Sequence, residues 1–247
     1  MSTRLPPVAC LSAAIAAVSW LACAPERATA CPLTITAGDD VIECTSGAAG
    51  SLVDLQGNNS LIFPSGNGSV QSVTYGAGND LIEMNTAGAV IGAGGINMGD
   101  GANIFRLFQG QVNGPIVQGA GADVVQISGG QAGSISQGAG IDRFSMSAGT
   151  IASLAQGDGH DIFAMSGGTI TGAFEDGDEA LMSGGTIGRV DMKLDNNLFD
   201  MRGGTIEYER APSTGLHVIG VGGLALARGL TLEGLLVSYV LRNVGAA

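Results

Sequence analysis

The sequence predicts an all-β protein, a right-handed parallel β-helix or β-solenoid with coils of about nineteen residues. A six-residue phrase, MSAGTI and then MSGGTI, MSGGTI and MRGGTI, recurs at steps of 19, 17 and 19 and begins at Met146, Met165, Met182 and Met201. A second phrase, Gly-x-Gly-x-Asp, runs in phase with it over residues 119–123, 138–142 and 157–161. Short units repeating at a fixed period bury their apolar face only by stacking on their neighbours.

Composition supports this architecture. Glycine contributes 42 residues and proline only 7, without a G-X-Y triplet, which excludes collagen and proline-rich linkers. Apolar residues reach 45% while charged residues are 13%, which is too apolar for a disordered chain. We therefore expect many short strands that bury small and medium side chains, with glycine at the turns.

One period shows how a coil is expected to fold. Residues 161–166 alternate between apolar and small or polar residues as a strand does, Gly167 and Gly168 turn the chain, and residues 169–174 form a second strand. A Gly-x-Gly corner such as residues 157–159 then closes the coil. Each coil is thus predicted to have two strands and two turns, with hydrogen-bond partners in the coils on either side.

Stacking in register predicts columns of equivalent side chains that face the core. The first column comprises Ile42, Ile82, Phe105, Val125, Phe144, Phe163 and Phe199. The second lies two residues later and comprises Cys44, Met84, Leu107, Ile127, Met146, Met165, Met182 and Met201. On the other half of the coil, the facing column comprises Val112, Ile151, Ile170, Ile187 and Ile206, beside a ladder of Thr150, Thr169, Thr186 and Thr205.

The repeat is less regular toward the N-terminus. Gly76 to Gly99 spans 23 residues, so the stretch from Asn85 to Asn97 is predicted to bulge out as a surface loop. Residues 57–63 look like a degenerate coil and residues 36–44 like the first coil.

Two segments flank the repeat region, which we assign to residues 31–210. Residues 1–30 have the charged, apolar and small-residue succession of a secretory signal peptide, ending in Ala28-Thr29-Ala30. A lipid anchor on Cys23 is the alternative. Residues 211–247 consist of short apolar bursts separated by glycines, which predicts irregular shorter coils or a C-terminal cap.

Removal of residues 1–30 would leave two cysteines, Cys31 and Cys44. An even pair in an exported chain suggests a disulfide that closes a short loop, worth about 3 kcal/mol in the chain-entropy model. In the alternative, Cys44 is a small buried residue, since it occupies the column position of Met165.

The charge balance restricts the possible partners. Without residues 1–30 the chain carries 8 Lys and Arg against 21 Asp and Glu. Nucleic acid and anionic lipid both need basic patches, so neither is an expected partner. The balance fits a soluble surface or one that binds cations.

No motif predicts an enzyme. The chain has two histidines, and His160 lies in a repeat corner where other coils place Ala, Asn or Ile. Gly-x-Ser-x-Gly is absent, and Gly220-Val221-Gly222-Gly223 lacks the Lys-Ser of a phosphate loop. A carbohydrate-active solenoid would use grouped Asp, Lys and Arg, but Lys193 and scattered arginines motivate it only weakly.

The MSGGTI phrase alternating with GDGxDxF behind a signal peptide resembles the repeat region of autotransporter passenger domains, the secreted part of type V secretion proteins. The resemblance covers about residues 36–210. It implies an exported, non-enzymatic structural or adhesive protein at the cell surface, outer membrane or outside the cell, reached through the periplasm, with an unknown host or surface ligand. Family members carry a C-terminal translocator barrel, for which about ten or more strands are needed. Residues after Arg210 are too few for it, so we expect a passenger fragment, a truncated gene product or a stand-alone secreted solenoid. An outer-membrane translocator barrel is an expected partner if one is supplied elsewhere.

One polar column carries the only candidate for site chemistry. It comprises Asp40, Asp80, Asn103, Asp123, Asp142, Asp161, Asp178 and Asn197. The Gly-x-Gly-x-Asp corners resemble the turns of RTX nonapeptide β-rolls, which implies Ca²⁺ as a cofactor held by Asp80, Asp123, Asp142 and Asp161. The first glycine of that motif is replaced by Tyr75, Met98, Gln118, Gln137 and Gln156. In the alternative, these residues stay at the surface and cap tight turns by accepting backbone N–H groups, without a metal.

Overall fold

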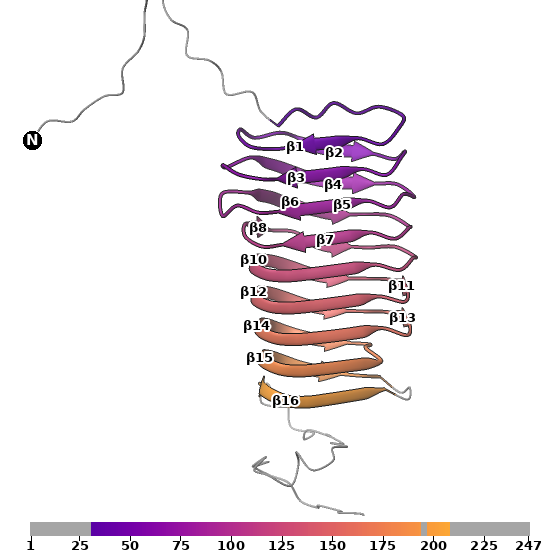
Figure 1. Ribbon diagram of the computed structural model, residues 1–247, viewed down its shortest axis with the longest axis vertical. Coiled ribbons are helices and arrows are strands. Elements are labelled where there is room, and N and C mark those ends of the chain that lie inside the picture. Colours follow the sequence, from indigo (N-terminus) through magenta and orange to yellow (C-terminus); the bar gives the residue numbers. More distant parts are fainter. Residues whose placement is uncertain (1–30, 194–196, 208–247) are drawn as a thin grey trace, which may run out of the picture.

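The computed structural model describes residues 31–193 and 197–207, and within these ranges every regular element is a β-strand. The strands stack as parallel coils of a β-solenoid, with the N-terminal coils at one end and the C-terminal coils at the other (Figure 1). One strand from each coil forms a continuous ladder in the order β1-β3-β5-β7-β10-β12-β14-β15-β16. The predicted fold class is thereby confirmed.

The early coils are built from separate short strands. Their bounds are β1 Val41–Glu43, β2 Ser51–Asp54, β3 Ser60–Phe63, β4 Ser69–Tyr75, β5 Leu81–Met84, β6 Val90–Asn97, β7 Ile104–Leu107, β8 Gln111–Val112 and β9 Ile116–Val117. The later coils have long strands, β10 Val124–Ser136, β12 Arg143–Ala155, β14 Ile162–Glu175, β15 Glu179–Asp191 and β16 Leu198–Ile206. Between them, β11 Ala139–Gly140 and β13 Asp158–Gly159 pair at the Gly-x-Gly corners.

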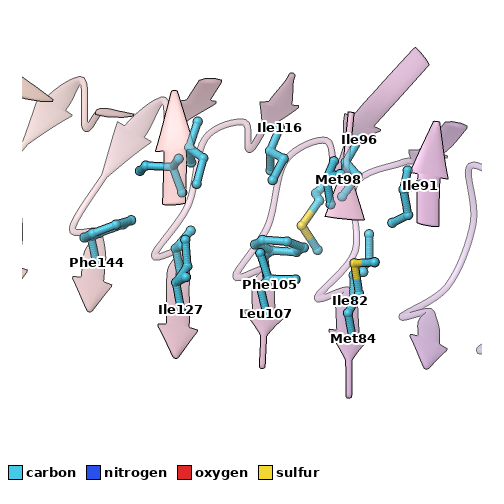
Figure 2. Close-up of a cluster of buried hydrophobic side chains, with 14 of the residues drawn as sticks. Ile82, Met84, Ile91, Ile96, Met98, Phe105, Leu107, Ile116, Ile127 and Phe144 are labelled. Atoms are coloured by element: carbon cyan, nitrogen blue, oxygen red, sulfur yellow. The ribbon is translucent and has the colours of Figure 1, made fainter. Parts of the chain in front are cut away.

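The inward columns are confirmed by the strand register. Phe144 pairs with Phe163 and Met146 with Met165 between β12 and β14. The core consists of these columns from the β1-to-β16 ladder facing the apolar residues of the opposite strands (Figure 2), and Phe105 and Leu107 meet Ile116 there. Each inner member buries apolar surface on both sides because the coils above and below place apolar residues at the same position.

A row of phenylalanines runs along the later coils. Phe144 and Phe163 are parallel with ring centroids 5.4 Å apart. The next coil has Ala180 in this column, and Phe174 stacks on Phe163 at 4.2 Å and reaches Phe199 at 6.5 Å. Phe174 therefore continues the row past the small residue.

The Gly-Gly corner differs from the prediction. We predicted two strands separated by a turn at Gly167-Gly168, but β14 continues through both glycines as one bent strand with a register shift. Gly168 has φ +90, and an added Cβ would lie 2.6 Å from Met146 Cε. Glycine permits this left-handed backbone, which bends the strand without ending its hydrogen bonding.

Of two predictions about the N-terminal coils, one is confirmed and one is wrong. Residues 57–63 belong to a coil as predicted, because β3 pairs with β1 and β5 and contributes the buried Leu61 and Phe63 to the columns. The stretch from Asn85 to Asn97 is not a surface loop, since residues 90–97 form β6 and bury Ile91 and Ile96. The surplus residues are accommodated as a register shift against β4 around residues 92–94, because a bulge keeps both flanking apolar residues facing inward.

The predictions for residues 1–30 and 211–247, and for Cys23 and His217, lie outside the described residues. In the part of the chain that the structure describes, no helix is long and apolar enough to span a membrane.

Candidate functional site: a buried ladder of acidic side chains

The acidic column forms a continuous hydrogen-bonded ladder, which we call the Asp ladder. Its members in the described coils are Asp40, Asn59, Asp80, Asn103, Asp123, Asp142, Asp161 and Asp178. Each backbone N–H donates to the side-chain oxygen of the equivalent residue in the next coil, as from Asp123 to Asp142 Oδ1 and from Asp142 to Asp161 Oδ1, both at 2.8 Å. The side chains thus tie one coil to the next at a corner where the backbone turns.

The ladder is buried, which corrects the surface position that we predicted. Asp80, Asp123, Asp142 and Asp161 are at most 1% exposed. Alternate residues of a strand share a face, and Asp161 precedes the inward Phe163 by two residues, so it faces inward as well. Our surface prediction took the residue type as the guide, whereas the period of two decides the direction of the side chain.

Only one carboxyl oxygen of each buried aspartate has a partner. Oδ1 accepts the backbone N–H, while Oδ2 of Asp80, Asp123, Asp142 and Asp161 is buried without a hydrogen bond. A buried carboxylate with an unpaired oxygen is costly in its charged form. These four atoms are the least satisfied polar groups of the ladder.

Burial is the main cause of the pKa shifts in the ladder. It raises the pKa of Asp123 to about 7 and the pKa values of Asp80 and Asp161 to about 6. The pKa of Asp142 is also raised by burial. The backbone N–H bond to each carboxyl opposes the shift, and neighbouring carboxylates add to it in Asp80, Asp123 and Asp161. Burial exceeds the hydrogen bond in all four.

A second ladder, of glutamines, lies beside the first. Gln118, Gln137 and Gln156 are at most 2% exposed. Gln156 Nε2 donates to Gln137 Oε1 at 3.2 Å, and Gln137 Nε2 donates to Gln118 Oε1 at 3.4 Å. Gln156 is the last member, and its Oε1 is buried without a partner. We had treated these residues as departures from the RTX motif, although their nineteen-residue spacing could have predicted a ladder.

The glutamine column has other residues in the early coils. Asp54 pairs with Tyr75 in the register of β2 and β4, and both side chains are buried. Burial raises the pKa of Asp54, and it also raises the pKa of Tyr75, with Asp80 as the next cause. Sequence reasoning placed Tyr75 in this column only as a departure from the RTX motif, and it missed Asp54 and Asn59, because the early repeats lack the phrase that marks the corner.

The arrangement differs from a clustered Ca²⁺ site. Ca²⁺ takes six to eight oxygen ligands, and the ladder offers its carboxyls in single file along the stack. In the described ranges, no three or more His, Cys, Asp or Glu side chains are grouped so as to hold a metal ion. Ca²⁺ binding by Asp80, Asp123, Asp142 and Asp161 therefore stays a prediction.

Cys31 and Cys44 are joined by a disulfide, with their Cα atoms 4.6 Å apart. Both residues are buried, and Cys44 also occupies the methionine column as the alternative proposed. The disulfide connects residue 31 to the first coil at the end of β1.

The outer surface has a shallow groove of about 270 Å³ that crosses four coils, which we call the serine groove. Its lining residues are Gln126, Ile127, Ser128, Ser145, Met146, Ser147, Ala164, Met165, Ser166, Leu181 and Ser183. The serines are exposed and come from successive strands. The groove therefore offers hydroxyl groups repeated from coil to coil.

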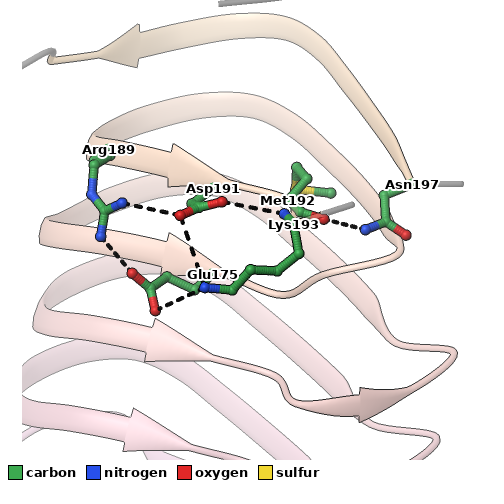
Figure 3. A network of polar contacts seen from close by, with 6 residues as sticks. All are labelled: Glu175, Arg189, Asp191, Met192, Lys193 and Asn197. Atoms are coloured by element: carbon green, nitrogen blue, oxygen red, sulfur yellow. Dashed lines mark hydrogen bonds and ion pairs between the residues drawn. The ribbon is translucent and has the colours of Figure 1, made fainter. Parts of the chain in front are cut away.

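An ion-pair network lies at the C-terminal ends of β14 and β15 (Figure 3). Arg189 contacts Glu175 and lies 3.2 Å from Asp191, and Lys193 Nζ lies 3.7 Å from Glu175. Lys193, which we considered for a carbohydrate-active solenoid, is thus engaged with carboxylates at the surface. His160 is exposed at the corner of β13.

One family model, that of the Z1 domain, matches residues 183–247. The match covers less than half of the chain, and its described part is the end of β15 together with β16. No curated protein and no solved structure matches the chain. The chain is therefore similar to the Z1 family only in its C-terminal part, and its fold is that of a β-solenoid of stacked coils.

Proposed function

We propose that this chain is an exported structural and adhesive β-solenoid of the autotransporter-passenger kind, without catalytic activity. The observation that carries the proposal is the serine groove, which crosses four stacked coils as an open, extended surface. A long groove of repeated exposed hydroxyls suits contact with an extended ligand on a host or cell surface, while enzyme sites are usually deeper concave pockets.

Adhesion is tested with beads that carry the chain, offered to immobilised polysaccharides and matrix proteins. Ala164→Arg places a long side chain on the floor of the groove and should abolish retention of the beads. Ala122→Arg, at an exposed corner outside the groove, is the matched control and should leave retention unchanged. Equal retention of both variants, or no retention of the unaltered chain on any surface, would contradict the adhesive role.

Export is tested by N-terminal sequencing of the chain recovered from a Gram-negative host that expresses it. Cleavage after Ala30 with recovery from the periplasm or medium is expected, since residues 28–30 have the small-residue pattern of a cleavage site. A chain that keeps residues 1–30 and stays in the cytosol would contradict export.

The second candidate function is a Ca²⁺-binding RTX-like secreted protein. It is favoured by the unpaired Oδ2 atoms of Asp80, Asp123, Asp142 and Asp161. Calorimetric titration of the chain with Ca²⁺ decides the matter. No heat and no shift in melting at millimolar Ca²⁺ would remove this alternative.

A further inference from the structure

The Asp ladder contains two asparagines. Their Nδ2 atoms occupy the position of Oδ2 in the aspartates, and they show which partner an atom at this position can have. Asn59 Nδ2 donates to the carbonyl of Gln56 at 3.1 Å, and Asn103 Nδ2 donates to the carbonyl of Gly99 at 3.1 Å. In both residues, Oδ1 accepts the inter-coil N–H in the same way as the aspartates do. An amide therefore satisfies the ladder with one acceptor and one donor.

An aspartate in the same column has Oδ2 in place of that donor. A charged carboxylate only accepts hydrogen bonds, so its Oδ2 cannot donate to a corner carbonyl as the amide does, whereas a protonated carboxyl has one O–H to donate. Oδ2 of Asp123, Asp142 and Asp161 has no partner in the fully charged form. These three residues occupy consecutive coils, so their charges would also stack about 4.8 Å apart within the protein.

In the described part of the chain, no ion pair brings a positive charge to these carboxyls. The groups that raise their pKa values by charge are acidic, namely Asp142 and then Asp100 for Asp123, and Asp142, Asp178 and Asp176 for Asp161. The neighbouring glutamine column is neutral. Among the described residues, the ion pairs of Arg106, Arg189, Lys193 and Arg202 are all with other carboxylates. Arg143 and His160 are exposed to solvent.

We propose that Asp123, Asp142 and Asp161 hold protons on Oδ2 in the folded protein, so that the stack is most stable in mild acid and loses stability when these protons leave. The raised pKa values agree with this proposal. Burial raises the pKa of Asp123 to about 7 and that of Asp161 to about 6. The folded chain then binds more protons than the unfolded chain between about pH 4 and pH 7. This stability is complete below the ordinary pKa of aspartate and is lost as the pH rises through 6 to 7.

The experiment compares the melting temperature of the full chain from pH 5 to pH 8. The triple variant Asp123→Asn/Asp142→Asn/Asp161→Asn supplies at each position the amide that Asn103 already has. We expect the unaltered chain to lose several degrees between pH 5 and pH 8, and the triple variant to keep its melting temperature and to exceed the unaltered chain at pH 8. Asp158→Asn removes one exposed charge from the same corner and should leave the slope unchanged.

Further measurements keep the proposal open to refutation if the triple variant does not fold. The infrared C=O stretch of protonated carboxyls should be present in the folded, unaltered chain at pH 5 and decline by pH 8, and Asp142→Asn alone should reduce it. The proposal is overturned if that band is absent at pH 5, or if melting is as high at pH 8 as at pH 5. It is also overturned if Ca²⁺ abolishes the pH dependence, which would show that a cation neutralises the ladder.

Discussion

The early coils, residues 31–119, and the late coils, residues 124–207, build the same core from different strands. The early strands are two to eight residues long, whereas β10, β12, β14 and β15 have 13 or 14 residues and bend through their glycines. Both regions nevertheless keep the inward columns in register. A solenoid therefore requires matching core positions between neighbours, and it tolerates variation where the backbone faces solvent.

The two regions also differ at the polar corner. The glutamine column begins at Gln118 at the end of the early coils and continues in the late coils with Gln137 and Gln156, and its members form amide-to-amide hydrogen bonds. The early coils place Asp54 and Tyr75 there, which leave buried oxygens without partners. Stacking like on like thus satisfies the amides of the glutamine column except Gln156 Oε1, whereas buried carboxyl oxygens stay without partners in both regions.

The largest loss of stability is expected from a substitution at a corner where the backbones of two late coils lie very close together. An added Cβ at Gly159 would lie 1.5 Å from the Gly140 carbonyl oxygen, in a backbone with φ +152. Gly159→Ala should therefore cost about 4 kcal/mol or more in the free energy of unfolding. Chemical denaturation measures it. Gly50→Ala in the early coils, where nothing lies within 4 Å of the added Cβ, is the control and should change stability by less than about 1 kcal/mol. Similar losses in both would mean that close backbone stacking does not govern the corners.

An intermediate effect is expected at the N-terminal end. Cys31→Ser removes the disulfide to Cys44, which closes a loop over 13 positions, and should cost about 3 kcal/mol. Because each coil contacts only its neighbours, the loss should be confined to β1–β3. Hydrogen exchange measures this directly, with faster exchange in β1–β3 and unchanged exchange in β12–β15. A uniform increase along the stack would show that the two regions unfold as one unit.

The smallest effect is expected at the surface ion pairs. Arg189→Ala in the late coils and Arg106→Ala in the early coils each remove a partly exposed guanidinium, whose exposed fractions are 53% and 38%. Solvent screens such pairs, so each should cost about 0.5 kcal/mol, and less in high salt. Melting at low and high salt measures both. A loss above about 2 kcal/mol for Arg189 alone would show that the network joins β14 to β15 more tightly than a surface pair does.

The sequence predicted the residues that follow the nineteen-residue period, and it missed residues in the early coils, where the spacing varies. The nineteen-residue period was enough to place Phe163 and Met165 in the core and Asp161 in the acidic column. The period could not reveal Asn59 or the strand β6, because the early coils contain 19 to 23 residues between equivalent positions. It also led us to read an acidic column as a surface feature, since charge is ordinarily exposed.

The sequence by itself determined the solenoid, its inward columns and the glycine corners, because repetition at a fixed period leaves stacking as the way to bury the apolar residues. Only the tertiary structure decided that the Asp ladder is buried and which of its oxygens have partners. Those properties depend on the coils above and below each residue, so no single repeat contains them. The pKa shifts follow from the same packing, since burial by neighbouring coils is their main cause.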